Sequence, residues 1–536
     1  MEDVSGIKKL GVMLDCSRDA VYTVGTLKNY FSFLAKMGYN TVQLYTEDTY
    51  EADGEPYFGY LRGRYSKAEL KELDAYARGI GIELVPCIQT LAHLGGITRW
   101  AEYGGITDIG DILLAGEERT YELIEHMFRT CAECFTSRRI NIGMDEAHML
   151  GLGAYLDKHG YKDRFSILSE HLRRVCEIAD KYGFKPMMWA DMFFRLANKG
   201  EYYCSGSKIP QSVIDLVPEN VELIYWDYYS RDKAHYDGMI RAHQQFRNNL
   251  VFAGGAMSWI GFAPNNRFSI EACRAAVQSC TENGVNDVFI TCWKDDGAEC
   301  SLFASLPALF CTAEAARGNT DEAALKKKFR KITGMDMSTF LAMDRMNLSG
   351  GEGGMNNPSK YMLYSDPFLG IFDRTAEGHS GEEFAAASKA LKAGEKNVRF
   401  GYIFKTLTAL GDVMEIKYTL GIRTREAYRN RDKEALGAIV GEYKELEKRL
   451  DKFYKRFAEQ WERECKPNGF EKHDIRLGGL KQRVRHCRNR LRKYSTGELR
   501  ALPELEEEIL PFGGIAPGSS VCYNNWTTIA MIKPNM

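Results

Sequence analysis

The sequence repeats one pattern eight times within residues 1–320: a short apolar segment followed by a longer amphipathic stretch. A short apolar segment is typical of a buried strand, and the amphipathic stretch is typical of a helix. Strands that alternate with helices pair in parallel, because each helix carries the chain back to the start of the next strand. The eight segments are Lys9–Asp15, Thr41–Thr46, Glu83–Gln89, Arg139–Asp145, Lys185–Asp191, Glu222–Tyr228, Leu250–Ala256 and Val288–Trp293.

Eight strand–helix units in this length predict an α/β fold, a (β/α)8 TIM barrel over residues 1–320. Several segments are apolar throughout, as expected of strands buried on both faces. Ser66 and Glu69 form a capping-box pattern ahead of one amphipathic stretch, and Gly38 follows another as a helix stop. The alternative is an open, doubly wound sheet. The glycine-rich signatures of its nucleotide-binding versions do not open a helix in this sequence.

The remainder, residues 321–536, predicts a C-terminal region that is mostly α-helical. A Gly/Asn-rich loop, Ser349–Pro358, precedes long charged segments with helical spacing. The tail Val521–Met536 contains Trp526 and other apolar residues, so we expect it to dock on the protein. The predicted helices are Glu382–Lys396, Phe400–Arg429, Asp432–Glu464 and Leu477–Tyr494.

The segment Leu477–Tyr494 is strongly basic, which raises the possibility of a nucleic-acid patch. We favour a solvated helix face that pairs with acids such as Glu504–Glu508, since no aromatic residues alternate with its arginines. The whole chain is nearly neutral, with 71 Lys and Arg against 73 Asp and Glu. No stretch reaches the roughly 18 apolar residues of a membrane span. We therefore expect neither nucleic acid nor membrane as a partner.

Fourteen cysteines are scattered along the chain, whereas a disulfide scaffold clusters them in a short chain. The N-terminus shows no long apolar run ahead of a small-residue cleavage site, so we identify no secretory signal. Both observations predict reduced thiols and a cytoplasmic location. The close pair Cys131 and Cys134 has no second pair at zinc spacing, so we predict no metal site.

In a TIM barrel the catalytic residues lie at the C-terminal ends of the strands. Four of the seven tryptophans fall at or after predicted strands five to eight. Ordinary core packing would scatter them, so we predict an aromatic wall, which suits a sugar ring. Carboxylates occur at nearly every strand end, and a charged acceptor strengthens hydrogen bonds from sugar hydroxyls. These tryptophans are Trp189, Trp226, Trp259 and Trp293.

The adjacent acids Asp145 and Glu146 follow the apolar strand Ile140–Met144 without an intervening loop. Neighbouring residues of a regular strand point to opposite faces, so both acids can serve one site only if the chain bends there. Like charges this close, partly removed from water, push their pKa values apart. One can then remain protonated as an acid while the other is ionised.

The run from Asn141 to Glu146 resembles the Gly-x-Asp-Glu signature of glycoside hydrolase family 20, the β-N-acetylhexosaminidases. The agreement extends over roughly residues 7–320 and is closest to a compact bacterial branch that lacks the usual N-terminal α/β domain. The resemblance implies that Arg18 binds sugar hydroxyls and that His93 belongs to a relay, with Glu47 or Asp48 as its partner. It also implies that Trp189, Trp226 and Trp293 wall the pocket for the acetamide group and the sugar ring.

The sequence departs from the family pattern at three places. Met144 stands where a small residue is commoner, and Asp295 follows Trp293 where many members have Trp-x-Glu. The usual Tyr-x-Asp after strand seven is absent, so Tyr228 or Tyr229 is expected to supply the phenol. These departures leave open the choice between gluco and galacto sugars.

The resemblance implies hydrolysis of terminal N-acetylhexosaminides with the help of the substrate's own acetamide group. Glu146 would be the general acid and base, and Asp145 would hold the acetamide N–H. No step needs a metal or an organic cofactor. Alternatives are a retaining glycosidase with Asp191 or Asp295 as nucleophile, and a non-catalytic sugar-binding barrel. The helical region could complete the cleft or form a homodimer interface.

Overall fold

The computed structural model describes residues 6–295, 297–348 and 356–527. The chain forms two compact units, which we call the barrel unit and the helical unit. Each unit consists of three separate segments of the chain, because the units are defined by contacts in space and not by order in the sequence. The division after residue 320 therefore stays a prediction. The barrel unit comprises Met1–Ala256, Ser269–Trp293 and Ala308–Thr333, and the helical unit comprises Met257–Phe268, Lys294–Pro307 and Gly334–Met536.

Eight parallel strands close into a barrel in the order β1-β10-β9-β8-β7-β6-β3-β2. The first strand pairs with both the second and the last, which closes the ring. Each predicted segment overlaps one strand of the barrel, and β10 begins one residue before its segment, so the predicted TIM barrel is confirmed. The strands are β1 (Lys9–Asp15), β2 (Thr41–Tyr45), β3 (Glu83–Cys87), β6 (Arg139–Asn141), β7 (Lys185–Trp189), β8 (Glu222–Trp226), β9 (Leu250–Gly255) and β10 (Asp287–Cys292).

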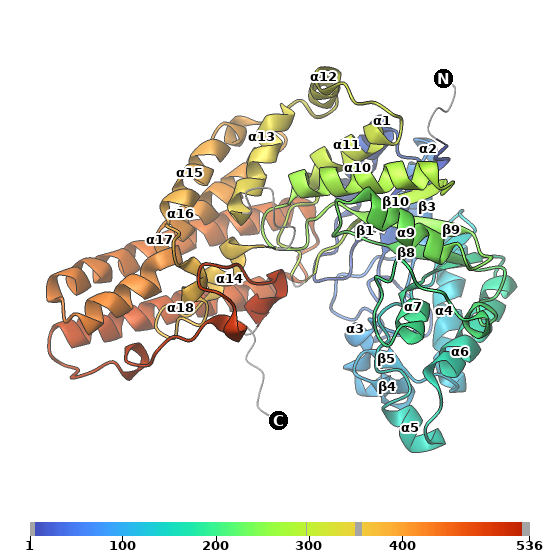
Figure 1. The fold of residues 1–536 in the computed structure, drawn as a ribbon, viewed down its shortest axis with the longest axis horizontal. Coiled ribbons are helices and arrows are strands. Elements are labelled where there is room, and N and C mark those ends of the chain that lie inside the picture. Colours follow the sequence, from blue (N-terminus) through green and yellow to red (C-terminus); the bar gives the residue numbers. More distant parts are fainter. Residues whose placement is uncertain (1–5, 296, 349–355, 528–536) are drawn as a thin grey trace. The chain divides into compact units, whose positions relative to one another are not determined.

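Helices surround the strands of the barrel unit (Figure 1). The capping box ahead of α2 is present: Ser66 Oγ accepts from the Glu69 N–H, and the Glu69 carboxylate accepts from the Ser66 N–H. Two short strands, β4 (Thr107–Ile109) and β5 (Ile112–Leu113), form a separate antiparallel pair. The helices up to residue 333 are α1 (Val24–Met37), α2 (Lys67–Gly79), α3 (Gly95–Thr98), α4 (Glu118–Cys134), α5 (Ala154–His159), α6 (Arg164–Lys181), α7 (Asp191–Ala197), α8 (Gln211–Ile214), α9 (Lys233–His243), α10 (Asn266–Glu282), α11 (Leu306–Ala315) and α12 (Glu322–Thr333).

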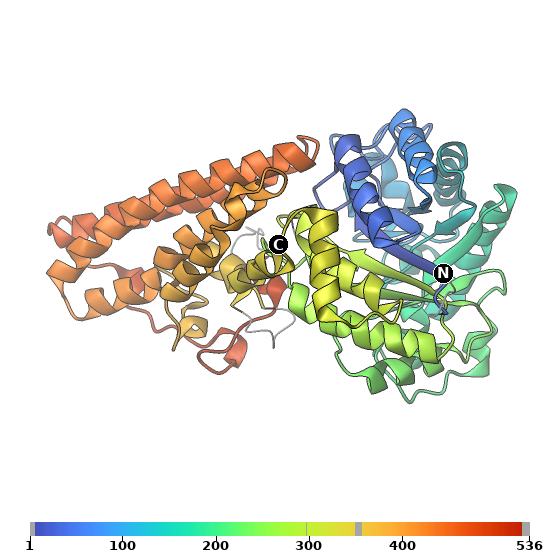
Figure 2. The ribbon, with the colours of Figure 1, turned by 90° about the horizontal axis from the view of Figure 1, so that it is seen from above.

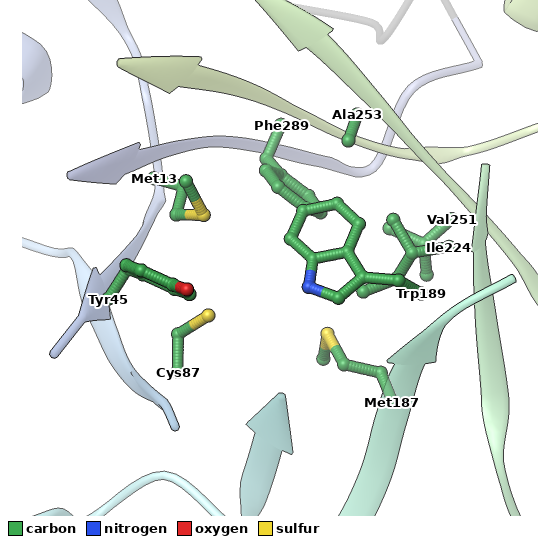
Figure 3. Close-up of a cluster of buried hydrophobic side chains, with 9 residues drawn as sticks. All are labelled: Met13, Tyr45, Cys87, Met187, Trp189, Ile224, Val251, Ala253 and Phe289. Atoms are coloured by element: carbon green, nitrogen blue, oxygen red, sulfur yellow. The ribbon is translucent and has the colours of Figure 1, made fainter. Parts of the chain in front are cut away.

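The barrel interior is filled by apolar side chains from seven of its eight strands. Figure 3 shows the Trp189 ring at the centre of this cluster, with Phe289 on one side and Met187 on the other. Trp226 and Trp293 are only partly buried and pack against the cluster. The full cluster is Met13, Tyr45, Cys87, Met187, Trp189, Ile224, Val251, Ala253 and Phe289.

Long helices dominate the helical unit, and α16 lies alongside α15 and α17, while α17 lies alongside α18 (Figures 1 and 2). Helices were predicted at all four of these positions. The loop predicted at Ser349–Pro358 falls largely outside the described residues. The helices are α13 (Met337–Leu341), α14 (Pro358–Tyr364), α15 (Glu382–Leu391), α16 (Gly401–Arg429), α17 (Lys433–Glu464) and α18 (Phe470–Ser495).

The described part of the tail docks on the helical unit, as predicted. Trp526 is fully buried, with its ring centroid 5.4 Å from that of Tyr364. The cations of Lys360 and Arg476 lie 4.3 and 4.6 Å from the Trp526 centroid.

The basic face of α18 pairs with acidic side chains of the same unit. Arg490 lies 2.9 Å from Glu504, and Arg483 lies 2.6 Å from Asp366. These ion pairs agree with the interpretation of a solvated, paired helix face. Within the described residues, no helix is both long enough and apolar enough to cross a membrane.

Candidate active site

The chain bends sharply after β6, at the point where the two adjacent acids stand. Gly143, Met144 and Glu146 have φ angles of 75°, 69° and 53°. Residues other than glycine rarely adopt positive φ, so two within three positions mark a backbone that its surroundings hold in place. As a result, both carboxylates approach one histidine: His93 Nε2 lies 3.2 Å from Asp145 Oδ2 and 3.7 Å from Glu146 Oε2. The bend that a shared site requires is present.

Asp145 is buried and held by two side chains. Gln89 Nε2 donates to Asp145 Oδ1 at 2.8 Å, and His93 stands at the other oxygen. Burial alone would raise the pKa of Asp145, but the charge of His93 and these hydrogen bonds outweigh it and lower that pKa. Burial by itself would lower the pKa of His93, but the negative charge of Asp145 outweighs burial and raises this pKa from 6.5 to about 9. The two side chains therefore form an ion pair at neutral pH.

Glu146 has a different environment from its neighbour. Its side chain is 43% exposed, whereas that of Asp145 is 12% exposed. Its main-chain N–H donates to Asp191 Oδ2 at 3.2 Å. A buried, ionised acid beside a solvent-accessible one is an arrangement that separates two chemical roles.

Gln89 links the bend to the rest of the barrel. Its Oε1 accepts from the Met144 N–H at 3.2 Å, and its Nε2 also donates to the Tyr45 hydroxyl at 3.1 Å. Sequence reasoning placed Gln89 at the end of the third strand but did not select it as a site residue. The available signal was an amide at the C-terminal end of an otherwise apolar segment.

We expect Gly143→Ala to disturb this arrangement. A Cβ at Gly143 would lie 2.0 Å from Gln89 Oε1 and 2.9 Å from the Ile88 carbonyl oxygen, at a φ of +75°. Moving Gln89 away would strain the hydrogen bond from the Met144 N–H to its Oε1 and the one from its Nε2 to Asp145. Stability should fall by about 1–3 kcal/mol more than in a glycine variant that has the backbone strain alone, which is the range for overpacking, as measured by urea unfolding. Gly116→Ala is a control, because its φ is +92° and no atom lies within 4 Å of the added Cβ. Equal losses in the two variants would contradict a role for the Gln89 contact.

Arg18 lies near carboxylates of two strand ends. Its Nε is 3.4 Å from Glu47 Oε1 and 3.9 Å from Asp15 Oδ2. Its side chain is about one third exposed, which leaves it accessible to a ligand.

Of the two acids considered as partner of His93, Glu47 is the one whose charge interacts with that of His93. Burial raises the pKa of Glu47, while the charges of Arg18 and His93 lower it. Asp48 instead pairs with Arg62. The structure therefore favours Glu47 over Asp48 as the group that acts on His93.

Four predicted aromatic residues form one connected network in the barrel unit. The rings of Trp189 and Trp293 have centroids 6.0 Å apart, and Trp293 meets Tyr45 edge-on at 4.8 Å. Trp293 Nε1 donates to the Tyr228 hydroxyl at 3.1 Å, and Tyr228 stacks on Trp226 at 5.4 Å. An aromatic network of this kind presents both ring faces and polar edges.

Tyr228 also lies within electrostatic reach of the acids. Burial raises the pKa of Tyr228, and the negative charge of Asp145 adds to this effect. Tyr229 meets Tyr228 edge-on, and its N–H donates to Asp227 Oδ1 at 3.2 Å. These contacts favour Tyr228 over Tyr229 as the phenol near Asp145.

Trp259 and Asp295 belong to the helical unit, whereas the four aromatic residues of the network belong to the barrel unit. Trp259 is buried, with 2% of its surface exposed. Asp295 Oδ2 accepts from the Tyr523 hydroxyl at 3.1 Å. A role of these two residues at the site stays a prediction.

A closed (β/α)8 barrel that carries paired acids, a charged histidine and aromatic rings from several strands has an architecture found among glycoside hydrolases. Residues 10–239 match the catalytic domain of glycosyl hydrolase family 20, and residues 338–521 match the glycoside hydrolase 20C C-terminal domain. The chain belongs to glycoside hydrolase family 20.

Similar proteins include hexosaminidase D from Homo sapiens, 24% identical over 233 residues. This match covers 42% of the present chain and 45% of the human protein. Hexosaminidase D from Bos taurus is 25% identical over 38% of this chain and 58% of that protein, so the matches span about half the length of these curated relatives. Among solved structures, the exo-β-N-acetylglucosaminidase of Vibrio harveyi in complex with N-acetylglucosamine aligns with a TM-score of 0.47 and 14% identity, over 61% of this chain and 58% of that one.

Proposed function

We propose that this chain is an exo-acting β-N-acetylhexosaminidase that removes terminal, non-reducing β-linked GlcNAc or GalNAc with retention of configuration. The observation that carries the proposal is the position of Asp145 and Glu146, both of which approach His93 at the bend after β6. The family membership and the hexosaminidase names of the relatives support the substrate class.

In the proposed first step, the carbonyl oxygen of the 2-acetamido group attacks C1 and forms an oxazolinium ion. Glu146 donates its proton to the leaving oxygen as the glycosidic bond breaks. Asp145 accepts the acetamide N–H and stabilises the positive charge that develops on the acetamide. The lowered pKa of Asp145 supports this role, since only the ionised carboxylate can do both. The exposure of Glu146 suits a group that must reach an aglycone oxygen.

In the second step, Glu146 removes a proton from water as the water oxygen attacks C1 and the oxazolinium ring opens. Tyr228 donates its phenol to the acetamide oxygen, and Trp226 and Trp293 hold the acetamide under C1, which is catalysis by orientation. Trp189 is fully buried in the barrel core, so it would act through its contact with Trp293. Arg18 binds ring hydroxyls.

The environment of Asp191 argues against the rival mechanism with a carboxylate nucleophile. Asp191 is fully buried, and its Oδ2 already accepts the N–H of Glu146. Burial raises its pKa to about 7, so a large fraction is protonated at neutral pH and cannot attack C1. The second rival nucleophile, Asp295, accepts a hydrogen bond from Tyr523.

Hydrolysis of the 4-nitrophenyl β-glycosides of GlcNAc, GalNAc and glucose, measured side by side, tests the proposal. We expect kcat/KM for the better acetamido substrate to exceed that for the glucoside by at least about 1000-fold, because effective molarities of well-placed internal nucleophiles are very large. A thiazoline analogue of the oxazolinium should inhibit competitively. Comparable turnover of the glucoside, without thiazoline inhibition, would support a carboxylate nucleophile instead.

We further propose a cytoplasmic location and oligosaccharide substrates. Twelve of the fourteen cysteines, all but Cys204 and Cys522, are buried, which suits thiols in a reducing compartment. Residues 321–536 would act as a helical domain, either completing the cleft or forming a homodimer interface.

A further inference from the structure

Asp191 stands at the start of α7, two residues after the end of β7. Its side chain is fully buried. Oδ2 accepts the N–H of Glu146 at 3.2 Å and lies 3.4 Å from Arg195 Nε. Oδ1 is buried and has no hydrogen-bond partner among the described residues. One oxygen of this carboxyl group therefore binds a main-chain N–H of another segment, and the other oxygen is buried without a partner. This arrangement can fix the position of that main chain.

The main chain that it holds belongs to the proposed general acid. Glu146 has a φ of 53°, a conformation that only surrounding contacts can impose on a glutamate. Three side chains bind N–H groups of this bend: Asn141 binds that of Gly143, Gln89 binds that of Met144, and Asp191 binds that of Glu146. The direction of the Glu146 carboxylate depends on this turn, because the side chain leaves the backbone there.

The charges that face Asp191 come from three segments. Asp145 and Glu146 lie on the bend, Arg195 on α7, and Tyr202 on the segment after it. Burial and the negative charge of Asp145 raise the pKa of Asp191 to about 7, against the lowering effects of the Glu146 N–H and Arg195. Below pH 7 the group is therefore mostly the neutral acid.

We propose that Asp191 is a positioning residue for Glu146: it binds the Glu146 N–H and fixes the turn that aims the Glu146 carboxyl at the leaving oxygen. The inference rests on the proposed function of Glu146 as general acid. Asp191 is fully buried and contacts the main chain of Glu146, so in this proposal its effect must appear through proton donation by Glu146.

Two N-acetyl-β-glucosaminides with different leaving groups test the proposal. A methyl leaving group needs a proton from Glu146, whereas 2,4-dinitrophenolate departs without one. We expect Asp191→Ala to lower kcat/KM about 50-fold on the methyl glycoside and less than about 3-fold on the dinitrophenyl glycoside, since a misaimed acid loses much of its effect. Asp191→Asn keeps an oxygen for the Glu146 N–H and should remain within about 5-fold of the wild type on both.

A second measurement reports on the neutral state and does not depend on activity. A carboxyl whose pKa is raised to about 7 in the folded protein binds a proton that the unfolded chain releases near pH 4, so stability decreases as pH rises from about 4 to 7. Asp191→Asn does not titrate. Its Tm relative to the wild type should therefore rise between pH 5 and pH 8.

Asp344→Asn is a matched control, because Asp344 is also buried with a pKa raised to about 6 and accepts the Arg267 N–H at 2.9 Å. The Tm of Asp344→Asn relative to the wild type should also rise with pH. Its kcat/KM relative to the wild type should be the same on the methyl and the dinitrophenyl glycoside. Equal losses on both glycosides in Asp191→Ala, or a Tm difference for Asp191→Asn that stays constant with pH, would overturn the inference. A wild-type protein that hydrolyses neither glycoside would instead refute the proposed function, and the inference with it.

Discussion

Glu146→Gln is expected to lower kcat/KM on methyl N-acetyl-β-glucosaminide by about 1000-fold, because an amide cannot protonate the leaving oxygen. On the 2,4-dinitrophenyl glycoside the loss should be less than about 10-fold, since this leaving group departs as the anion. Initial rates at low substrate concentration measure both quantities. The contrast between the two substrates is the signature of a general acid.

Glu177→Gln provides the control for this variant, since Glu177 is an exposed glutamate of α6. It should leave both rates unchanged. Glu146→Gln with near-full activity on the methyl glycoside would assign the proton to another residue.

Asp145→Asn is expected to lower kcat/KM by about 100- to 1000-fold on both glycosides, the range for removing one preorganised group that stabilises transition-state charge. The loss should not depend on the leaving group, because Asp145 acts on the acetamide and not on the departing oxygen. Parallel rates on the two substrates therefore separate the roles of the two neighbouring acids. An asparagine variant that retained most of its activity would disprove this assignment.

The same variant changes the charge of His93. The pKa of His93, about 9, is raised chiefly by Asp145. In Asp145→Asn this attraction is lost while burial remains, so the pKa of His93 should fall from about 9 towards its ordinary value of 6.5. NMR of the imidazole protons as a function of pH measures this pKa. Asp157→Asn, a substitution at an exposed residue of α5, should leave this titration unchanged.

The barrel was predictable because its signals are local. Burial on both faces makes each strand an apolar run, as in Thr41–Thr46, which contains β2. The Ser66–Glu69 capping box is read from residues three positions apart and closes as expected. The boundary predicted for the fourth segment differs from the structure: β6 ends at Asn141 and not at Asp145, because the chain bends at Gly143, whose φ is 75°.

The contacts of the site were only partly predictable. Adjacency in sequence singled out Asp145 and Glu146, and the required bend is present. The approach of Gln89 to Asp145 joins residues 56 positions apart, and it depends on how β3 and β6 pair in the barrel. The preference for Glu47 over Asp48 likewise depends on Arg62, which takes Asp48 as its partner.

Periodicity, helix caps and the Asp145-Glu146 pair are properties of the chain itself, so the sequence alone determined the fold class and the principal acids. The charge states of His93, Asp145 and Asp191 are properties of the folded protein. A pKa depends on burial and on the distance to other charges, and both arise only when separate strand ends meet. Only the tertiary structure therefore decided which carboxyl is ionised, which is held neutral and which faces solvent.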